Sequence, residues 1–198
     1  MNRKNILARM SIVFMILSLF GTGSLLVGDV TLAVPERIQE YSLWCWAGTS
    51  QAALNYYNQP PSQCQIANFA WRTNKCCGAF YGFNNAAKGC NKINYLWGSA
   101  GSVQNILANW GVSSTGIEAP LSWADTVSEL DNGFPFFMRF GWLQGGGGHF
   151  LVTYGYITAG SYLQYMDPWP GEGYTTSLFS WVVSAPDHIW THTLTTYQ

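Results

Sequence analysis

The chain has 198 residues, of which 48% are hydrophobic, 16% aromatic and only 10% charged. This length fits a single domain preceded by a targeting segment, and it suffices to bury a sizeable core. The formal net charge of −1 lacks the basic excess of nucleic-acid-binding domains, so no nucleic-acid partner is expected. The aromatic content indicates bulky packing and favours a surface groove lined by some of the rings.

The first 33 residues are typical of a secretory signal peptide. Three basic residues precede the apolar run 10–27, and a small residue, Ala33, offers a cleavage site. An uncleaved anchor is the alternative, because the run approaches the roughly 20 residues that span a bilayer. Serine, glycine and threonine interrupt the run and favour cleavage near Ala33. We therefore expect residues 34–198 to form one secreted, extracytoplasmic domain, monomeric and without a stable membrane partner.

The five cysteines fall into a cluster of four and a single residue. An oxidising compartment favours disulfides, and an odd count leaves one thiol over. The adjacent Cys76 and Cys77 do not readily pair with each other, so we expect them to bond Cys64 and Cys90, in either of two arrangements. Zinc is the competing interpretation, but the cluster has no Cys-x-x-Cys pair and no nearby histidine. Cys45 is the odd thiol.

Helical patterns dominate the N-terminal half. Small and apolar residues recur at helical spacing from Cys45 to the Asn-Gln-Pro-Pro sequence of residues 58–61, which predicts a helix over this stretch. Residues 62–92 are rich in Asn, Gly and Cys, so we expect irregular or short-helical structure pinned by the disulfides. Two further helices are expected, over residues 102–111, closed by a glycine, and 122–133, capped by a serine.

Strand patterns follow in the C-terminal half. Runs of aromatic, aliphatic and β-branched residues predict four strands, over residues 134–140, 149–157, 162–167 and 188–197. A Thr-Ala-Gly-Ser turn connects the second of these strands to the third. Helices followed by antiparallel strands define an α+β architecture. We expect a helical lobe and a sheet lobe with a cleft between them.

Cys45 lies between Trp44 and Trp46, and it is open to three interpretations: a packed core thiol, half of a disulfide, or a nucleophile. The odd cysteine count argues against the disulfide. A helix N-terminus stabilises a thiolate through its unpaired N–H groups and positive dipole end, and a neighbouring imidazolium does so more strongly. Cys45 is placed for the first effect. We expect Trp44 to wall the groove and contact substrate, and Trp46 to belong to the core.

Three histidines are candidates for the second effect. His149 follows four glycines and opens a predicted strand, so the backbone there can pass close to a substrate, and Gly147 and Gly148 are candidate substrate-binding residues. His188 and His192 have a spacing that suits metal binding on a helix, but a strand separates them by about 13 Å. We interpret both as structural or surface residues, and we expect no metal and no cofactor.

Two further residues complete a candidate catalytic group. A catalytic imidazole needs a partner that fixes its tautomer and orientation. Asp167 ends the strand that pairs with the one opened by His149, so hairpin topology makes them neighbours, although an Asp before Pro is also a common turn residue. Gln39 lies six positions before Cys45, and its amide together with the Cys45 backbone N–H suits a developing oxyanion.

In this order and setting, the residues resemble the papain-like cysteine peptidases. The quoted motifs are Trp-Cys-Trp-Ala around Cys45, Gly-Gly-Gly-His-Phe around His149 and Asp-Pro-Trp from Asp167. The similarity is greatest to bacterial branches of the avirulence-effector type and their C39-like relatives, over roughly residues 35–180. It implies a papain-like fold in which Cys45 is the nucleophile, His149 the general base and later acid, Asp167 the orienting residue, and Gln39 an oxyanion donor.

Two features depart from this resemblance. Gly48 stands where alanine is commoner, which loosens the first turn of the helix by about 1 kcal/mol. The cysteine cluster is not a general family feature, and we interpret it as a local brace.

The leading hypothesis is a secreted cysteine endopeptidase that hydrolyses a protein or peptide substrate through a covalent thioester. Aromatic residues near the predicted site, Trp169 among them, are expected to shape substrate subsites. The same chemistry suits a cell-wall peptide amidase or a transglutaminase-type acyl transferase, although no wall-binding repeat is recognisable. A third hypothesis is an inactive, disulfide-braced binding module, against which the presence of all four site residues argues.

Overall fold

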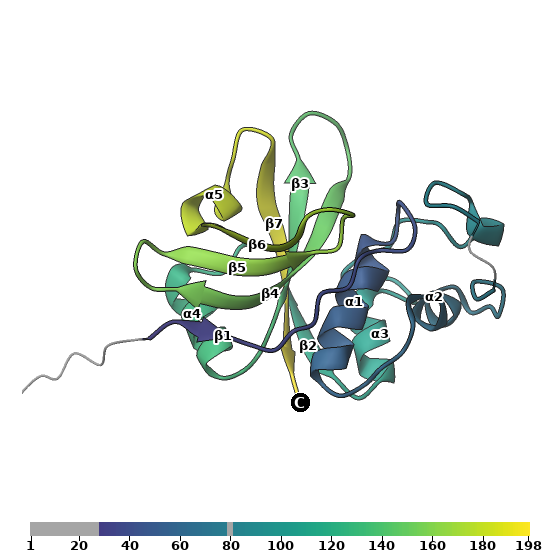
Figure 1. Ribbon diagram of the computed structural model, residues 1–198, viewed down its shortest axis with the longest axis horizontal. Coiled ribbons are helices and arrows are strands. Elements are labelled where there is room, and N and C mark those ends of the chain that lie inside the picture. The colour runs from purple at the N-terminus through teal and green to yellow at the C-terminus, as the bar shows by residue number, and fades with distance from the viewer. Residues whose placement is uncertain (1–27, 79–80) are drawn as a thin grey trace, which may run out of the picture.

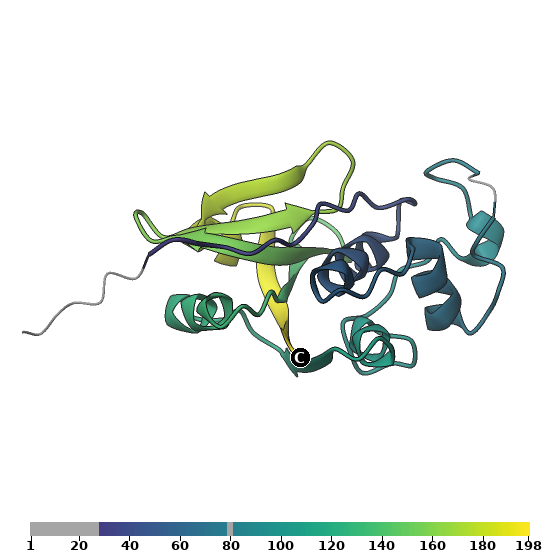
Figure 2. The same ribbon diagram turned by 60° about the horizontal axis from the view of Figure 1, so that its bottom comes forward.

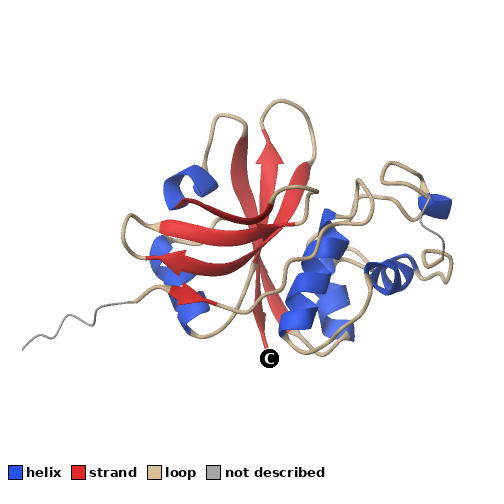
Figure 3. Ribbon diagram, in the orientation of Figure 1, coloured by secondary structure: helices blue, strands red, loops and turns tan. Residues whose placement is uncertain are grey.

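A computed structural model describes residues 28–78 and 81–198 (Figure 1). Three helices gather at one side and an antiparallel sheet occupies the other, as the colouring by secondary structure shows (Figure 3). The helices are α1 (Cys45–Tyr56), α2 (Gln63–Trp71) and α3 (Val103–Asn109), with a short 3₁₀ turn at Ala87–Gly89. The predicted α+β class, with helices in the N-terminal half and strands in the C-terminal half, is confirmed.

Helix α1 joins the two lobes. It begins at Cys45, as predicted, and ends at Tyr56, shortly before the predicted stop at residues 58–61. It contacts α2, α3 and the strand β4 (Gly148–Ile157). Its residues Trp46, Ala47 and Leu54 are fully buried. Because helical stability in proteins comes chiefly from packing of an apolar face, this burial fixes the helix and the cysteine at its start.

Helix α2 lies in the segment that was expected to be irregular or short-helical. Its start is a capping box, in which the Ser62 hydroxyl accepts from the Gln65 N–H and the Gln65 side chain accepts from the Ser62 N–H at 2.8 Å. Such a box satisfies two amide groups that the helix leaves unpaired. The Ser-Gln-Cys-Gln sequence is therefore a helix-start signal, and it does not depend on apolar periodicity.

The four clustered cysteines form two disulfides. Cys64 bonds Cys77 and Cys76 bonds Cys90, which selects one of the two predicted arrangements. The Cys64–Cys77 bond fastens α2 to the loop that follows it. The Cys76–Cys90 bond fastens that loop to the start of the segment that continues through residues 91–98. Cys45 is the free cysteine, as predicted.

The sheet has the strand order β2-β7-β3-β4-β5-β6, and every neighbouring pair is antiparallel. The bounds, apart from β4, are β2 (Ser113–Ile117), β3 (Phe137–Trp142), β5 (Tyr162–Asp167), β6 (Gly173–Leu178) and β7 (His188–Tyr197). Strands β5 and β7 have the predicted bounds. Strand β3 starts three residues later than predicted, because the Phe136 N–H donates to the Thr153 hydroxyl instead of to a strand backbone.

Strands β2 and β6 were not predicted, and both lie at an edge of the sheet. Each is short and rich in Ser, Thr and Gly, with an exposed or half-buried majority of side chains. With so few apolar residues, neither segment shows the strong apolar alternation that identifies a strand in a sequence.

Side chains from the two faces of the sheet enter two separate cores. Phe150, Val152 and Tyr154 of β4 face α1, whereas Leu151 and Tyr156 face the opposite side. That side is covered by α4 (Trp123–Asp131) and α5 (Phe179–Val183), as the turned view shows for α4 (Figure 2). Helix α4 matches its prediction, including capping by the hydroxyl of the preceding serine.

The segment just before the helical lobe also belongs to the sheet. Strand β1 (Val30–Thr31) pairs with β4, and the Leu32 N–H donates to the Tyr154 carbonyl at 2.6 Å. A side chain at Gly155 would collide with the Val30 carbonyl, so β4 is shaped to receive this strand. Most of the predicted signal peptide, residues 1–27, lies outside the described residues. Removal of all of residues 1–33 would also remove β1.

Within the described part of the chain, no helix combines the length and the apolar character needed to cross a membrane.

Candidate active site

The Cys45 thiol stands at the first residue of α1. The preceding residue, Trp44, makes no side-chain hydrogen bond to the helix, so no side chain caps the amide groups of the first turn. Cys45 is half-buried and lines a groove between the lobes. The sulfur therefore lies at the positive end of the helix dipole and is reached from the groove.

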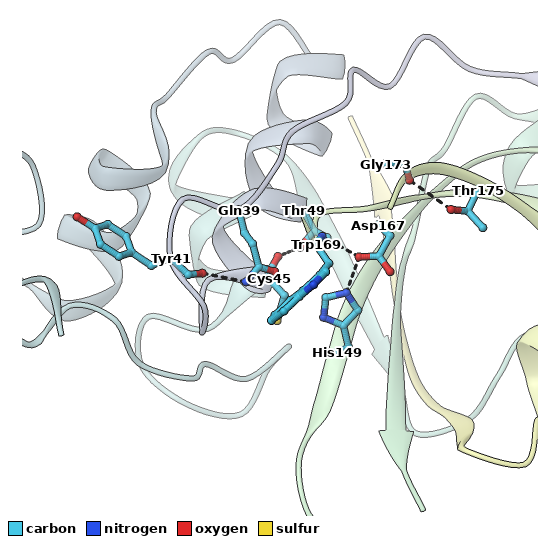
Figure 4. A network of polar contacts seen from close by, with 9 residues as sticks. All are labelled: Gln39, Tyr41, Cys45, Thr49, His149, Asp167, Trp169, Gly173 and Thr175. Atoms are coloured by element: carbon cyan, nitrogen blue, oxygen red, sulfur yellow. Dashed lines mark hydrogen bonds and ion pairs between the residues drawn. The ribbon is translucent and has the colours of Figure 1, made fainter. Parts of the chain in front are cut away.

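His149 and Asp167 meet as the hairpin topology predicted. His149 is the second residue of β4 and Asp167 the last of β5, and these strands pair antiparallel. His149 Nε2 lies 2.6 Å from Asp167 Oδ1, which also accepts the Trp169 N–H at 2.8 Å. Figure 4 shows the ring between Asp167 and Cys45. With Nε2 bound to the carboxylate, Nδ1 is the nitrogen left to face the thiol.

The surroundings of His149 favour its protonated form. Burial lowers the pKa of the imidazole, but hydrogen bonds with Asp167 and Cys45, and the charges of both groups, outweigh burial and raise the pKa of His149 to about 10. An imidazolium beside a thiol stabilises the thiolate by direct charge interaction. The geometry and the pKa therefore both suit a cysteine–histidine pair.

Gln39 is held against the first turn of α1. Its side chain is buried, its Nε2 donates one hydrogen bond to the Tyr41 carbonyl at 2.8 Å, and its backbone N–H donates to the Pro168 carbonyl at 2.7 Å. An amide nitrogen carries a second N–H. In Figure 4 the amide points toward Cys45, as an oxyanion donor should.

Gly48 explains how these segments come together. A Cβ at this position would lie 2.9 Å from Pro168 Cβ and 3.2 Å from the Arg37 carbonyl oxygen. The missing side chain allows the segment around Gln39 and the loop after Asp167 to lie on the helix. The departure from alanine at this position is thus a packing requirement of the site.

The prediction that Trp44 contacts substrate is wrong. Its side chain is 0% exposed, its ring lies edge-on to Tyr41 at 4.7 Å, and its indole N–H donates to the Cys90 carbonyl at 2.9 Å. Trp44 is adjacent to Cys45 in the sequence but does not line the groove, because successive side chains at a helix start point in different directions. Trp46 is buried, as predicted.

The other predicted substrate-binding residues do line the groove. Trp169 is 43% exposed, and its ring centroid lies 6.4 Å from that of His149. Gly147 and Gly148 line the same groove. Arg139 donates to the Gly147 carbonyl at 3.0 Å and fills the space where a Gly148 side chain would stand.

The groove has a volume of about 1090 Å³ and extends well beyond the cysteine–histidine pair. On the helical lobe its wall includes Leu43, Ile93 and Tyr95, and on the sheet lobe it includes Trp142. All four side chains are exposed and apolar or amphipathic. The groove therefore offers a ligand apolar walls from both lobes.

The two remaining histidines differ from each other. His188 is buried, bonds Asp187 at 2.8 Å and stacks on Phe140, so its structural interpretation stands. His192 instead lines the groove, 5.3 Å from the Trp97 ring. Burial and the nearby Arg139 lower the pKa of His192. Sequence reasoning missed His192 and Trp97 as groove residues because their contact joins segments almost a hundred residues apart.

A helix that begins at a free cysteine, packed on an antiparallel sheet that supplies a histidine and an aspartate, defines the papain-like class of cysteine peptidases. The Peptidase_C39 like family model matches residues 31–189. The chain therefore belongs to the Peptidase C39-like family, and it is a cysteine peptidase and a hydrolase. No curated protein sequence matches the chain.

Solved structures support the fold. A double glycine motif protease from an AMS/PCAT transporter, in complex with a leader peptide, covers 86% of this chain and 98% of its own at 17% identity, with a TM-score of 0.51. The peptidase domain of Streptococcus ComA covers 83% and 96% at 16% identity and a TM-score of 0.52. A Bacillus anthracis protein described as a C39-like peptidase covers 86% and 98% at 13% identity and a TM-score of 0.54.

Proposed function

We propose that the protein is an endopeptidase that cleaves peptide bonds through Cys45, His149 and Asp167. One observation carries the proposal: His149 Nε2 is bound to Asp167 Oδ1 at 2.6 Å, which leaves Nδ1 of the same ring to serve Cys45 in the groove that both residues line. This is the geometry in which a base is oriented by a third group and serves a nucleophile.

The groups act in sequence. The Cys45 sulfur attacks the peptide carbonyl carbon while its proton is held on His149, and a carbon–sulfur bond forms. The Cys45 backbone N–H and the second N–H of the Gln39 amide stabilise the oxyanion. His149 then donates its proton to the leaving amine, and the carbon–nitrogen bond breaks to give a thioester. Water, deprotonated by His149, hydrolyses the thioester and releases the acid.

An extended peptide is the substrate class that the site supports best. The groove runs past the cysteine between walls from both lobes, and its exposed aromatic and aliphatic side chains suit the side chains of a bound peptide. The solved double glycine motif protease, whose fold is similar, holds a leader peptide. That binding mode supports a peptide ligand here and does not fix its sequence.

Export of the protein is part of the proposal. Two disulfides support an oxidising compartment. Strand β1 supports cleavage before Val30 instead of near Ala33, because β1 pairs with β4. The mature chain would then keep β1 within its sheet.

A thiol-reactive activity probe tests the proposal. Labelling of the wild type is expected to depend on Cys45 and on His149, so Cys45→Ala and His149→Ala are both expected to abolish it, whereas His188→Ala is a histidine control outside the site. Labelling that survives His149→Ala would contradict the cysteine–histidine pair. Three reactions separate the alternatives. Cleavage of casein indicates a peptidase, release of peptides from peptidoglycan indicates an amidase, and transfer of the acyl group to an added free amine indicates an acyl transferase.

A further inference from the structure

Residues Cys90–Gly98, which we call the strap, cross from the helical lobe to the sheet lobe. The strap starts at the Cys76–Cys90 disulfide. Near its end the Trp97 ring lies on Gly116 of β2, where a side chain would collide with it. The strap is therefore anchored at both ends, by a covalent bond and by a ring packed on the sheet.

The first residues of the strap are bound to both tryptophans that flank the nucleophile. The Trp44 indole donates to the Cys90 carbonyl at 2.9 Å, and the Trp46 indole donates to the Lys92 carbonyl at 2.9 Å. Both tryptophans are fully buried. A buried donor left without its acceptor is strongly unfavourable, so these bonds fix the position of the strap relative to the start of α1.

Asn91, between Cys90 and Lys92, is bound to the same part of the chain through its side chain. Its Oδ1 accepts from the Leu43 N–H at 3.0 Å, and its Nδ2 donates to the Ser42 hydroxyl at 3.2 Å. Leu43 and Ser42 line the groove. Three consecutive residues of the strap are thus bound to residues on both sides of Cys45 in the sequence.

The rest of the strap forms a wall of the groove. Ile93 is 65% exposed and Tyr95 60% exposed, and both line it. The backbone behind them is fixed by the start of α3, whose Val103 N–H donates to the Tyr95 carbonyl at 3.0 Å and whose Gln104 N–H donates to the Leu96 carbonyl at 2.8 Å. A wall held in this way presents its exposed side chains in one position.

We propose that the strap is the element that positions the peptide in the groove, and that the Cys76–Cys90 disulfide, acting through the Trp44 and Trp46 indole bonds, sets its position. This inference rests on the proposed endopeptidase function. The disulfide then governs substrate binding, while Cys45 itself stays in place because α1 packs on β4, α2 and α3. Cys90, Asn91, Trp44 and Trp46 are positioning residues, and Ile93 and Tyr95 contact the peptide.

The chain offers a matched control, since its second disulfide, Cys64–Cys77, joins α2 to the loop that follows it and includes no residue of the strap. The assay uses a quenched fluorescent peptide, selected from a mixed-sequence library by wild-type cleavage. Replacing Cys76 and Cys90 by serine is expected to raise KM roughly tenfold and to leave kcat within about twofold. Replacing Cys64 and Cys77 by serine is expected to leave KM within about twofold.

The rate of Cys45 alkylation by iodoacetamide separates positioning of the peptide from damage to the nucleophile. It is expected to be unchanged in both double variants. Equal KM changes in the two variants, or slower alkylation with an unchanged KM, would overturn the proposal. If the Cys76→Ser and Cys90→Ser chain does not fold, Asn91→Ala is expected to raise KM roughly threefold with kcat unchanged, and an unchanged KM there would overturn the proposal.

Hydrogen exchange distinguishes failure of this inference from failure of the proposed function. If the wild type cleaves no peptide, the endopeptidase proposal fails. The strap is then tested by exchange alone. Loss of Cys76–Cys90 is expected to speed exchange of the Leu43 N–H, which donates to Asn91, and of residues 90–98. Loss of Cys64–Cys77 is expected to leave both segments unchanged. Equal protection of these segments in the two variants would overturn the role of the strap.

Discussion

The backbone N–H of Gln39 donates to the carbonyl oxygen of Pro168 at 2.7 Å. This bond joins the segment that carries the amide beside Cys45 to the loop that follows Asp167. It crosses the first turn of α1 at Gly48, the residue with no room for a side chain. The proposed oxyanion donor, nucleophile and orienting carboxylate are therefore aligned by one close contact among three segments distant in sequence.

Gly48→Ala tests that contact. Alanine favours a helix over glycine by about 0.5–1 kcal/mol, so the isolated helix gains. The added Cβ nevertheless meets Pro168 at 2.9 Å, and forcing an extra group into a packed site costs about 1–3 kcal/mol. We expect a lower free energy of unfolding in denaturant and a reduced kcat. A variant that is more stable and fully active would show that the contact does not align the site.

Asp167→Asn tests the electrostatics of His149. In the proposed mechanism the His149 imidazolium protonates the leaving amine, so activity is lost as pH rises through the His149 pKa of about 10. The carboxylate raises that pKa, and removing its charge lowers it. We expect the alkaline limb of kcat/KM to move to lower pH, together with the NMR titration of the His149 ring. An alkaline limb at the wild-type pH would mean that Asp167 does not hold the proton on His149.

Trp169 and Trp44 are expected to respond differently to substitution. Trp169→Ala removes an exposed ring from the groove, so it should raise KM with little change in thermal stability. Trp44→Phe removes a buried indole donor, while the Cys90 carbonyl keeps the Trp71 indole as a donor, so it should lower the free energy of unfolding by about 0.5–1.5 kcal/mol. Thermal unfolding and peptide kinetics on both variants provide the measurement. The reverse pattern would restore Trp44 as the substrate contact.

Strand β1 provides a prediction about the N-terminus. A chain that starts at Val34 lacks β1 and its bonds to β4, whereas a chain that starts at Gly28 keeps them. We expect the shorter chain to be less stable by about 1 kcal/mol for each backbone hydrogen bond lost. Denaturant unfolding of the two chains measures the difference, and equal midpoints would show that β1 adds nothing to the sheet.

Local sequence signals predicted much of the fold. The predicted elements include the Cys45 helix, the capped helix α4 and strands β5 and β7. They were predictable because their periodicity or their caps depend only on residues close together in the sequence. Strand β2 was not, because its partner β7 lies far along the chain, and β6 was not, because its Gly, Thr and Ser residues give no strong apolar pattern. The same holds for β1, whose partner β4 lies more than a hundred residues further along the chain.

The candidate site was predictable where one hairpin or one helix start positions a residue. His149 and Asp167 met because β4 and β5 are joined by a short turn, and Cys45 lay at a helix start. The groove walls were not predictable, because Tyr95 and His192 reach them through contacts between distant segments. Trp44 was misassigned for the same reason, since its acceptor is the carbonyl of a residue in the strap.

Rapid-quench mass spectrometry of the enzyme during peptide turnover tests the central claim most directly. Acid quenching in the first turnover is expected to trap an acyl group on Cys45, with the mass of the N-terminal product joined as a thioester. Cys45→Ala should show no such adduct. Peptide cleavage without any adduct on Cys45, or cleavage that persists in Cys45→Ala, would contradict the account.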